Sequence, residues 1–169
     1  MPRSLGAAAL LLGLLGACGG PGYDGRVYRD DEARYALEAP GDAWEALDVD
    51  AQNDLAWRHR GIGAVMQANA RCDPALDIPL EALTAHLLIG FTERRDREET
   101  RVPMDGREAL RTELRAKLDG VERSLVFVVL KKDGCVYDFA LVAAPAHRDE
   151  AGAAFDALVA SFAAGRGGQ

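Results

Sequence analysis

The 169-residue sequence lacks an excess of basic side chains: 20 Lys and Arg residues stand against 27 Asp and Glu residues, a net charge of −7. No stretch of the chain is a Lys/Arg-rich stripe of the kind that binds nucleic acid or anionic lipid. The composition therefore predicts no nucleic-acid partner. Any contact with a membrane must come from something other than surface charge.

The sequence also lacks a recognisable metal motif. His59, His86 and His147 are widely separated, with no pair at the spacing that places two ligands on one helix face, so zinc would require convergence in the fold. Segment 48–54 alternates oxygen ligands like the start of a calcium loop, but Asn53 replaces the required glycine. We favour a solvated turn there and expect no metal and no cofactor.

Signatures of common catalytic sites are missing as well. Segment 61–63 has two glycines but lacks the third that a dinucleotide-binding loop needs. Ser124 and Ser161 have no nucleophile-elbow context. Trp44 and Trp57 either line a pocket or pack in the core, and we favour packing in the core. The sequence thus predicts a protein that is not an enzyme.

The apolar run at the N-terminus is short. Residues 5–15 follow Arg3 and are too few to span a bilayer as an ordinary helix, whereas a basic residue, a short apolar core and small residues before a cleavage point are typical of a secretory signal. The segment Leu15-Gly16-Ala17-Cys18 resembles the lipobox of bacterial lipoproteins, although Gly16 replaces the commoner Ala or Ser. Plain secretion and an uncleaved anchor are the alternatives.

The lipobox resemblance implies the following organisation. Residues 1–17 would be the signal peptide, Cys18 the lipidated residue, and 18–25 a glycine-rich tether. Position 19 is Gly, so the Asp that retains many such lipoproteins at the inner membrane is absent. We therefore expect a Gram-negative cell-envelope lipoprotein, anchored in the outer membrane and facing the periplasm, that contacts the membrane through its lipid.

Two cysteines remain after Cys18 is assigned to the anchor. An even pair in a protein that leaves the cytoplasm favours a Cys72–Cys135 disulfide. Free buried thiols are one alternative. A thiol hydrolase with Cys72 or Cys135 as nucleophile and a histidine as base is the other, but no local signature marks such a pair.

The first half of the chain predicts short strands and one helix. Segments 34–39 and 44–49 are candidate strands, and 55–58 pairs with 64–71 across a glycine turn. Residues 80–88 place leucines on one helical face behind Pro79. Segment 93–101 contains four acidic and four basic residues, which favours a solvated connector.

The second half predicts an antiparallel meander and a closing helix. Segment 107–118 fits both a helical and a strand period, and the flanking turns favour a strand; it is followed by strands at 124–130 and 135–143. In the last strand Val136, Asp138, Ala140 and Val142 share one face. A helix is expected from about 149 to 162, and residues 165–169 should fray.

These elements make an α+β domain with a mostly antiparallel sheet flanked by helices. The pattern Tyr35-x-Leu37-x-x-Pro40-x-x-x-Trp44, the segment 105–109 before the meander, Tyr137, and 155–162 with Ser161-Phe162 resemble the PsbP/Mog-type domain. The resemblance implies an α/β/α sandwich over residues 26–164, and a fold that mostly supports binding and assembly. No family site residue maps onto this chain.

We therefore expect a non-enzymatic envelope lipoprotein that binds an envelope protein partner or supports an assembly. The second hypothesis is a small-ligand-binding lipoprotein with a cleft between helix and sheet. The thiol hydrolase is the third. A thiol count separates the third hypothesis from the other two, because a disulfide would remove its nucleophile.

Overall fold

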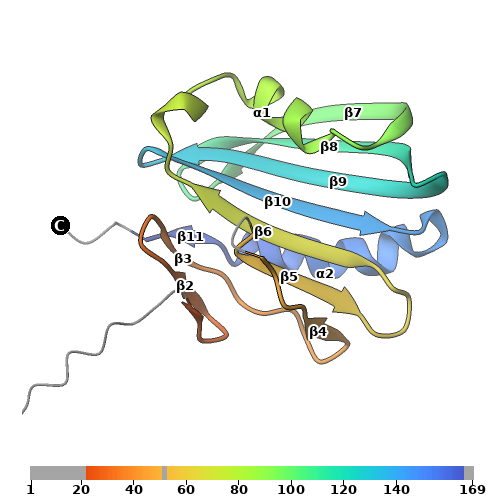
Figure 1. Cartoon of the computed structure of the whole chain (residues 1–169), viewed down its shortest axis with the longest axis horizontal. Coiled ribbons are helices and arrows are strands. Elements are labelled where there is room, and N and C mark those ends of the chain that lie inside the picture. Colours follow the sequence, from red (N-terminus) through yellow and green to blue (C-terminus); the bar gives the residue numbers. More distant parts are fainter. Residues whose placement is uncertain (1–21, 51–52, 166–169) are drawn as a thin grey trace, which may run out of the picture.

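The computed structural model describes residues 22–50 and 53–165, which form two antiparallel sheets and two α-helices (Figure 1). The small sheet has the order β1-β2-β3-β11 and the large sheet the order β4-β5-β6-β10-β9-β8-β7. The strands are β1 Gly22–Tyr23, β2 Val27–Arg29, β3 Arg34–Ala36, β4 Trp44–Ala46, β5 Leu55–His59, β6 Val65–Arg71, β7 Thr92–Met104, β8 Arg107–Leu118, β9 Val121–Lys132, β10 Cys135–Ala143 and β11 Ala163–Ala164. The α+β class predicted from the sequence is confirmed.

The meander of β8, β9 and β10 forms the centre of the large sheet. Its turns place Leu118 opposite Val121 and Lys132 opposite Cys135. In both turns an aspartate with positive φ precedes a glycine with positive φ, a combination that suits tight hairpins. The strand prediction for 107–118 is confirmed, because alternate residues of β8 are buried and pairing with β9 outweighs local helix propensity.

The hairpin of β5 and β6 extends the sheet on the far side of β10. Strand β6 pairs antiparallel with β10, so Arg71 lies opposite Val136. A 3-10 turn, η1 (Pro74–Leu76), then leads to helix α1 (Leu80–Leu87), which begins behind Pro79 as expected. The helix lies against β8 and β9, with Leu83 and Leu88 buried.

Segment 93–101 is not a connector. It belongs to β7, the edge strand paired with β8, and nearly all its side chains are exposed. The connector prediction was wrong because no apolar alternation marks a strand whose two faces are both solvated. Two register shifts and positive φ angles at Glu93 and Asp96 interrupt the strand. Bulges and dense charge protect an exposed edge from pairing with other chains.

Helix α2 (Arg148–Ala160), preceded by the 3-10 turn η2 (Pro145–His147), covers the opposite face of the sheet from α1 (Figure 1). Phe155 and Leu158 are buried in the main core. Phe162 lies just beyond the helix and packs its ring against Tyr35, Tyr137 and Phe139, with ring centroids 4.9 to 5.9 Å apart.

The small sheet joins the two ends of the domain. Strands of two or three residues carry too little pattern to be read from sequence, so β1, β2 and β11 were not anticipated. Strand β11 pairs with β3, and the backbone N–H of Gly165 donates to the carbonyl of Arg34 over 2.8 Å. Gly165, which was expected to fray, is therefore held against β3, and residues 166–169 lie outside the described part. Within 22–50 and 53–165, no helix has the length and apolar character to cross a bilayer.

Candidate functional site

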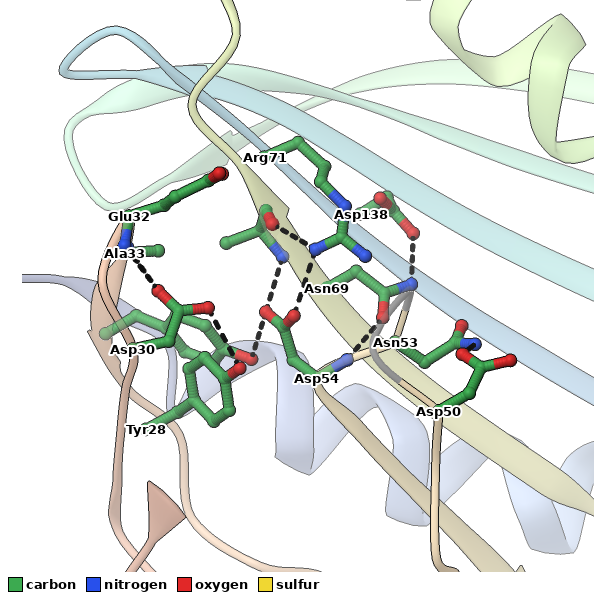
Figure 2. A network of polar contacts seen from close by, with 12 residues as sticks. Tyr28, Asp30, Glu32, Ala33, Asp50, Asn53, Asp54, Asn69, Arg71 and Asp138 are labelled. Atoms are coloured by element: carbon green, nitrogen blue, oxygen red, sulfur yellow. Dashed lines mark hydrogen bonds and ion pairs between the residues drawn. The ribbon is translucent and has the colours of Figure 1, made fainter. Parts of the chain in front are cut away.

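A cleft of about 550 Å³ lies between the small sheet and the beginning of β5. Five of its lining residues are acidic and Arg71 is the basic one; the full lining is Gly22, Tyr23, Tyr28, Asp30, Asp31, Glu32, Val49, Asp50, Asn53, Asp54, Leu55 and Arg71. Figure 2 shows the polar contacts that extend from this cleft toward β10. The excess of carboxylates makes the cleft suited to a cationic group.

Tyr28 lines the cleft and stacks on the buried Tyr35 behind it. The ring of Tyr28 lies on that of Tyr35, with centroids 5.0 Å apart and planes at 29°. The hydroxyl of Tyr28 donates to Oδ2 of Asp30 over 3.0 Å. Burial, the charge of Asp54 and the bond to Asp30 raise the pKa of Tyr28, so the hydroxyl stays protonated and serves as a donor.

Asp30 shapes the loop between β2 and β3. Its Oδ1 accepts hydrogen bonds from the backbone N–H groups of Glu32 at 2.8 Å and Ala33 at 2.6 Å. An aspartate that caps its own turn in this way fixes the loop without secondary structure. The exposed side chains of Asp31 and Glu32 are thereby held at the rim of the cleft.

Asp54 is the buried centre of the polar network. Its Oδ2 accepts from the backbone N–H of Ala70 at 2.8 Å and from the hydroxyl of Tyr35 at 3.2 Å. Its Oδ1 accepts from Nη1 of Arg71 at 3.0 Å. Burial raises the pKa of Asp54, and the hydrogen bonds from Arg71 and Ala70 act against that rise.

Asn69 carries the network from Asp54 to β10 (Figure 2). Its Oδ1 accepts from the backbone N–H of Asp54 at 3.0 Å, and its Nδ2 donates to Oδ1 of Asp138 at 3.1 Å. Asp138 is partly withdrawn from water, and desolvation raises its pKa to about 6, against the effects of Asn69 and Arg71.

A second, smaller cavity adjoins this network. It measures about 120 Å³ and lies between α1, η1, β9 and β10. Apolar side chains form most of its wall, namely Leu76, Leu83, Leu87, Val129 and Val136, and its polar lining is Arg71, His86 and Asp138. Arg71 lines both spaces, so the acidic cleft and the smaller cavity are neighbours.

The structure places the residues singled out in the sequence at several separate locations. Cys18 lies outside the described residues. Cys72 and Cys135 form a disulfide between the end of β6 and the start of β10. Neither sulfur is then a free thiol, which removes the nucleophile that the thiol-hydrolase hypothesis requires.

The histidines do not form a ligand set. Nε2 of His59 and Nδ1 of His147 lie 4.0 and 3.7 Å from carboxylate oxygens of Glu150, whereas His86 lines the small cavity on the other side of the sheet. Among the described residues, no group of three or more histidine, cysteine, aspartate or glutamate side chains could hold a metal ion.

The serines and tryptophans have structural positions. Ser124 is buried in β9, and the hydroxyl of Ser161 accepts from the backbone N–H of Glu38 and donates to the carbonyl of Leu158. Trp44 and Trp57 are buried and do not line the cleft. Segment 48–54 supplies cleft residues, but Asp54 turns inward to Arg71 and does not act as one of a ring of loop ligands.

Comparison with solved structures relates this geometry to a known fold. No protein-family model and no curated protein sequence matches the chain. The structure is similar to PsbP from the cyanobacterium Synechocystis, with a TM-score of 0.55, 19% identity, and coverage of 90% of this chain and 100% of that one. It has the PsbP fold. It is also similar to LpqN of Mycobacterium tuberculosis, involved in cell envelope biogenesis, with a TM-score of 0.54, 16% identity, and coverage of 80% and 87%.

One residue of the polar network could have been noticed in the sequence. Strand alternation placed Asp138 on one face with Val136 and Ala140, and a lone carboxylate on an apolar face is a signal of a special environment. Nothing in the sequence linked Asp138 to Asp54, because their connection runs through Asn69 and depends on the pairing of β6 with β10.

Proposed function

We propose that this protein is a lipid-anchored binding protein of the Gram-negative cell envelope, held at the periplasmic face of the outer membrane, and that it binds a protein partner without turnover. The observation that carries the proposal is the acidic cleft beside the small sheet. Its carboxylates and tyrosines suit a basic segment of a partner, because clefts of one sign concentrate the opposite charge.

The position of the cleft supports an anchored role. Gly22 lines the cleft, and the lipobox cysteine Cys18 stands four positions before it in the sequence. Four residues span at most about 14 Å when fully extended. A lipid on Cys18 would therefore keep the cleft near the bilayer surface and restrict partners to the envelope.

The chemistry of the cleft supports binding over catalysis. Asp30 and Asp54 accept hydrogen bonds from the chain's own donors, and the two cysteines near the site are joined to each other. Acid–base catalysis needs a poised group within reach of a substrate, and fixed structural acceptors are poorly suited to that task. The envelope role of LpqN, which shares the fold, agrees with this proposal.

A small-ligand role is the second candidate, and the cavity beneath α1 is the place between helix and sheet where such a ligand would bind. At about 120 Å³ this cavity is well below the roughly 300 Å³ at which ordinary small-molecule sites begin. Its size suits one side chain of a macromolecule better than a whole metabolite.

Site-specific photocrosslinking in cells tests the proposed partner. A photoreactive residue at Glu32, on the cleft rim, should capture an envelope protein. One at exposed Val121, the first residue of β9 and outside the cleft lining, should not; β9 begins at the end of the large sheet away from the small sheet (Figure 1). Adding Asp31→Lys should reduce capture at Glu32 several-fold by introducing like charge. Equal capture from both positions, unaffected by Asp31→Lys, would contradict binding through the cleft.

Membrane fractionation tests the anchor separately. Cys18→Ser should release the protein from outer-membrane fractions or leave an uncleaved precursor. If the variant fractionates and migrates like the wild type, the anchor proposal is wrong, while the cleft proposal can still be judged by crosslinking.

A further inference from the structure

The cavity beneath α1 combines an apolar wall with one carboxylate. Leu83, Val129 and Val136 are buried at its base, whereas His86 is exposed, so the cavity extends from the surface down to the sheet. Asp138 projects into it from β10, on the same face as Val136. A space of this composition can hold a group with an apolar stem and one polar end.

Only one of the two carboxylate oxygens of Asp138 accepts a hydrogen bond from a described residue. Oδ1 accepts from Asn69, and among the residues that the structure describes no donor is within hydrogen-bond distance of Oδ2. Asp138 lines the cavity, so its Oδ2 can accept a hydrogen bond from a ligand donor that enters.

Charge also favours a cationic donor. The side chains of Asp54, Arg71 and Asp138 lie in one network, and the guanidinium of Arg71 donates to Asp54 (Figure 2). With all three groups ionised, these three side chains together carry one negative charge in excess. An added cation beside Asp138 balances them.

We propose that this cavity binds a primary alkylammonium group, and specifically the side chain of a lysine from the protein partner that occupies the neighbouring acidic cleft. The source of the lysine rests on the proposed function, whereas the chemistry of the cavity does not. Arg71 lines both spaces, so a basic segment in the cleft lies close enough to insert one side chain beneath α1.

The volume fits this occupant. An engineered apolar cavity of roughly 150 Å³ admits benzene, which has six non-hydrogen atoms. A cavity of about 120 Å³ therefore has room for the five non-hydrogen atoms of butylammonium, the end of a lysine side chain. Its aliphatic part would contact Leu83 and Val136, and its ammonium would donate to Oδ2 of Asp138.

Methyl NMR on the full chain in detergent tests the cavity directly, with n-butylammonium chloride as the probe. Resonances of Leu83, Leu87 and Val136 should shift with a millimolar Kd, as expected for so small a ligand. 1-Butanol, which has the same stem without the charge, should bind about tenfold more weakly. Equal binding of the two probes, or no shift at about ten times the expected Kd, would overturn the proposal.

Two variants separate the cavity carboxylate from general surface charge. Asp138→Asn keeps an acceptor for Asn69 and should weaken butylammonium binding about tenfold or more. The matched control Asp133→Asn removes an exposed charge in the β9–β10 turn, outside this cavity, and should leave binding unchanged. If both variants weaken binding equally, the effect is long-range attraction and the site is not as proposed.

The pH profile gives a further readout. The charged or titratable groups near Asp138 are Arg71 on β6, His86 on α1 and Asp54 before β5. With the pKa of Asp138 at about 6, binding should be about tenfold weaker at pH 5 than at pH 7, because the carboxylate must ionise to accept the cation. His86→Gln should retain this dependence; its loss in that variant would assign the effect to His86 and overturn the role of Asp138.

Crosslinking in cells links the cavity to the partner. Capture from Glu32 should fall about tenfold in Asp138→Asn and remain unchanged in Asp133→Asn. If capture persists undiminished in Asp138→Asn, the partner's lysine is not the occupant, although the proposed function stands. If no partner is captured while butylammonium binds, the proposed function fails and the lysine assignment fails with it.

Discussion

The two faces of the large sheet differ most along β6 and β10. On the face covered by α2 these strands present apolar and aromatic side chains, including Met66, Tyr137 and Phe139, all buried in the main core. On the face that carries α1 the same strands present Asn69, Arg71 and Asp138. The face under α2 forms the main core. The face under α1 is less completely packed along these strands and leaves the cavity of about 120 Å³.

The comparison predicts that the largest losses of stability come from the α2 face. Phe155 is completely buried, and Phe155→Ala should lower the free energy of unfolding by about 3–5 kcal/mol. The loss should be the same at pH 5 and pH 7, because the surrounding core is apolar. Urea unfolding at both pH values measures it. A loss below about 1 kcal/mol would show that α2 is only loosely attached to the sheet.

The disulfide is expected to have the second largest effect on stability. It joins the end of β6 to the start of β10, close to Arg71 of the polar network. Its cysteines are 63 residues apart, and replacing both with serine should cost about 2–4 kcal/mol by freeing the unfolded chain. Unfolding of the wild type with and without reductant should show the same difference, and the double variant should not respond to reductant. The prediction is wrong if reductant leaves the free energy of unfolding of the wild type unchanged.

Within the polar network, Asp54 is expected to be the most costly residue to change. Asp54→Asn removes the carboxylate from Arg71 and places an amide N–H₂ among three donors, so stability should fall by about 2–3 kcal/mol. Asn53→Ala, beside it and hydrogen-bonded to Asp50, is the control and should cost about 1 kcal/mol or less. Equal losses for the two variants would mean that Asp54 has no special role.

The smallest effect, and one of opposite sign, is expected at Asp138. Its pKa rises from 3.8 to about 6 on folding, so the folded protein binds the proton more tightly and this group makes stability fall as pH rises from about 4 to 6. Asp138→Asn should remove that slope and stabilise the protein by about 1–2 kcal/mol at pH 7. Unfolding measured at pH 4 and pH 7 tests it, and a variant with the wild-type slope would refute it.

The sequence predicted those parts of the fold in which one face of an element is apolar. Strands β8, β9 and β10 and both helices were found in this way, because burial on one side imposes a period of two or about 3.6 residues. Strand β7 was missed because it is an edge strand with exposed, charged side chains on both faces. The strands of the small sheet were missed because two or three residues are too few to show a period.

The site was harder to predict than the fold. The acidic residues in 48–54 read as a solvated turn, although Asp54 is buried by pairing with Arg71, which lies 17 positions later in the chain. The cavity depends on how α1 and η1 rest on β9 and β10, which no local pattern specifies. Long-range contacts of this kind decide which carboxylates are solvated and which are not.

The pairing of β3 with β11 also has a consequence for the timing of folding. A chain emerges N-terminus first, from the ribosome or from a membrane channel, and the small sheet cannot be completed until residues 163–164 arrive to join residues 35–36. Contacts between such distant segments form late, because the intervening chain must be ordered first. The small sheet, whose strands β1 and β2 border the cleft, therefore gains its last strand only after the whole domain has emerged.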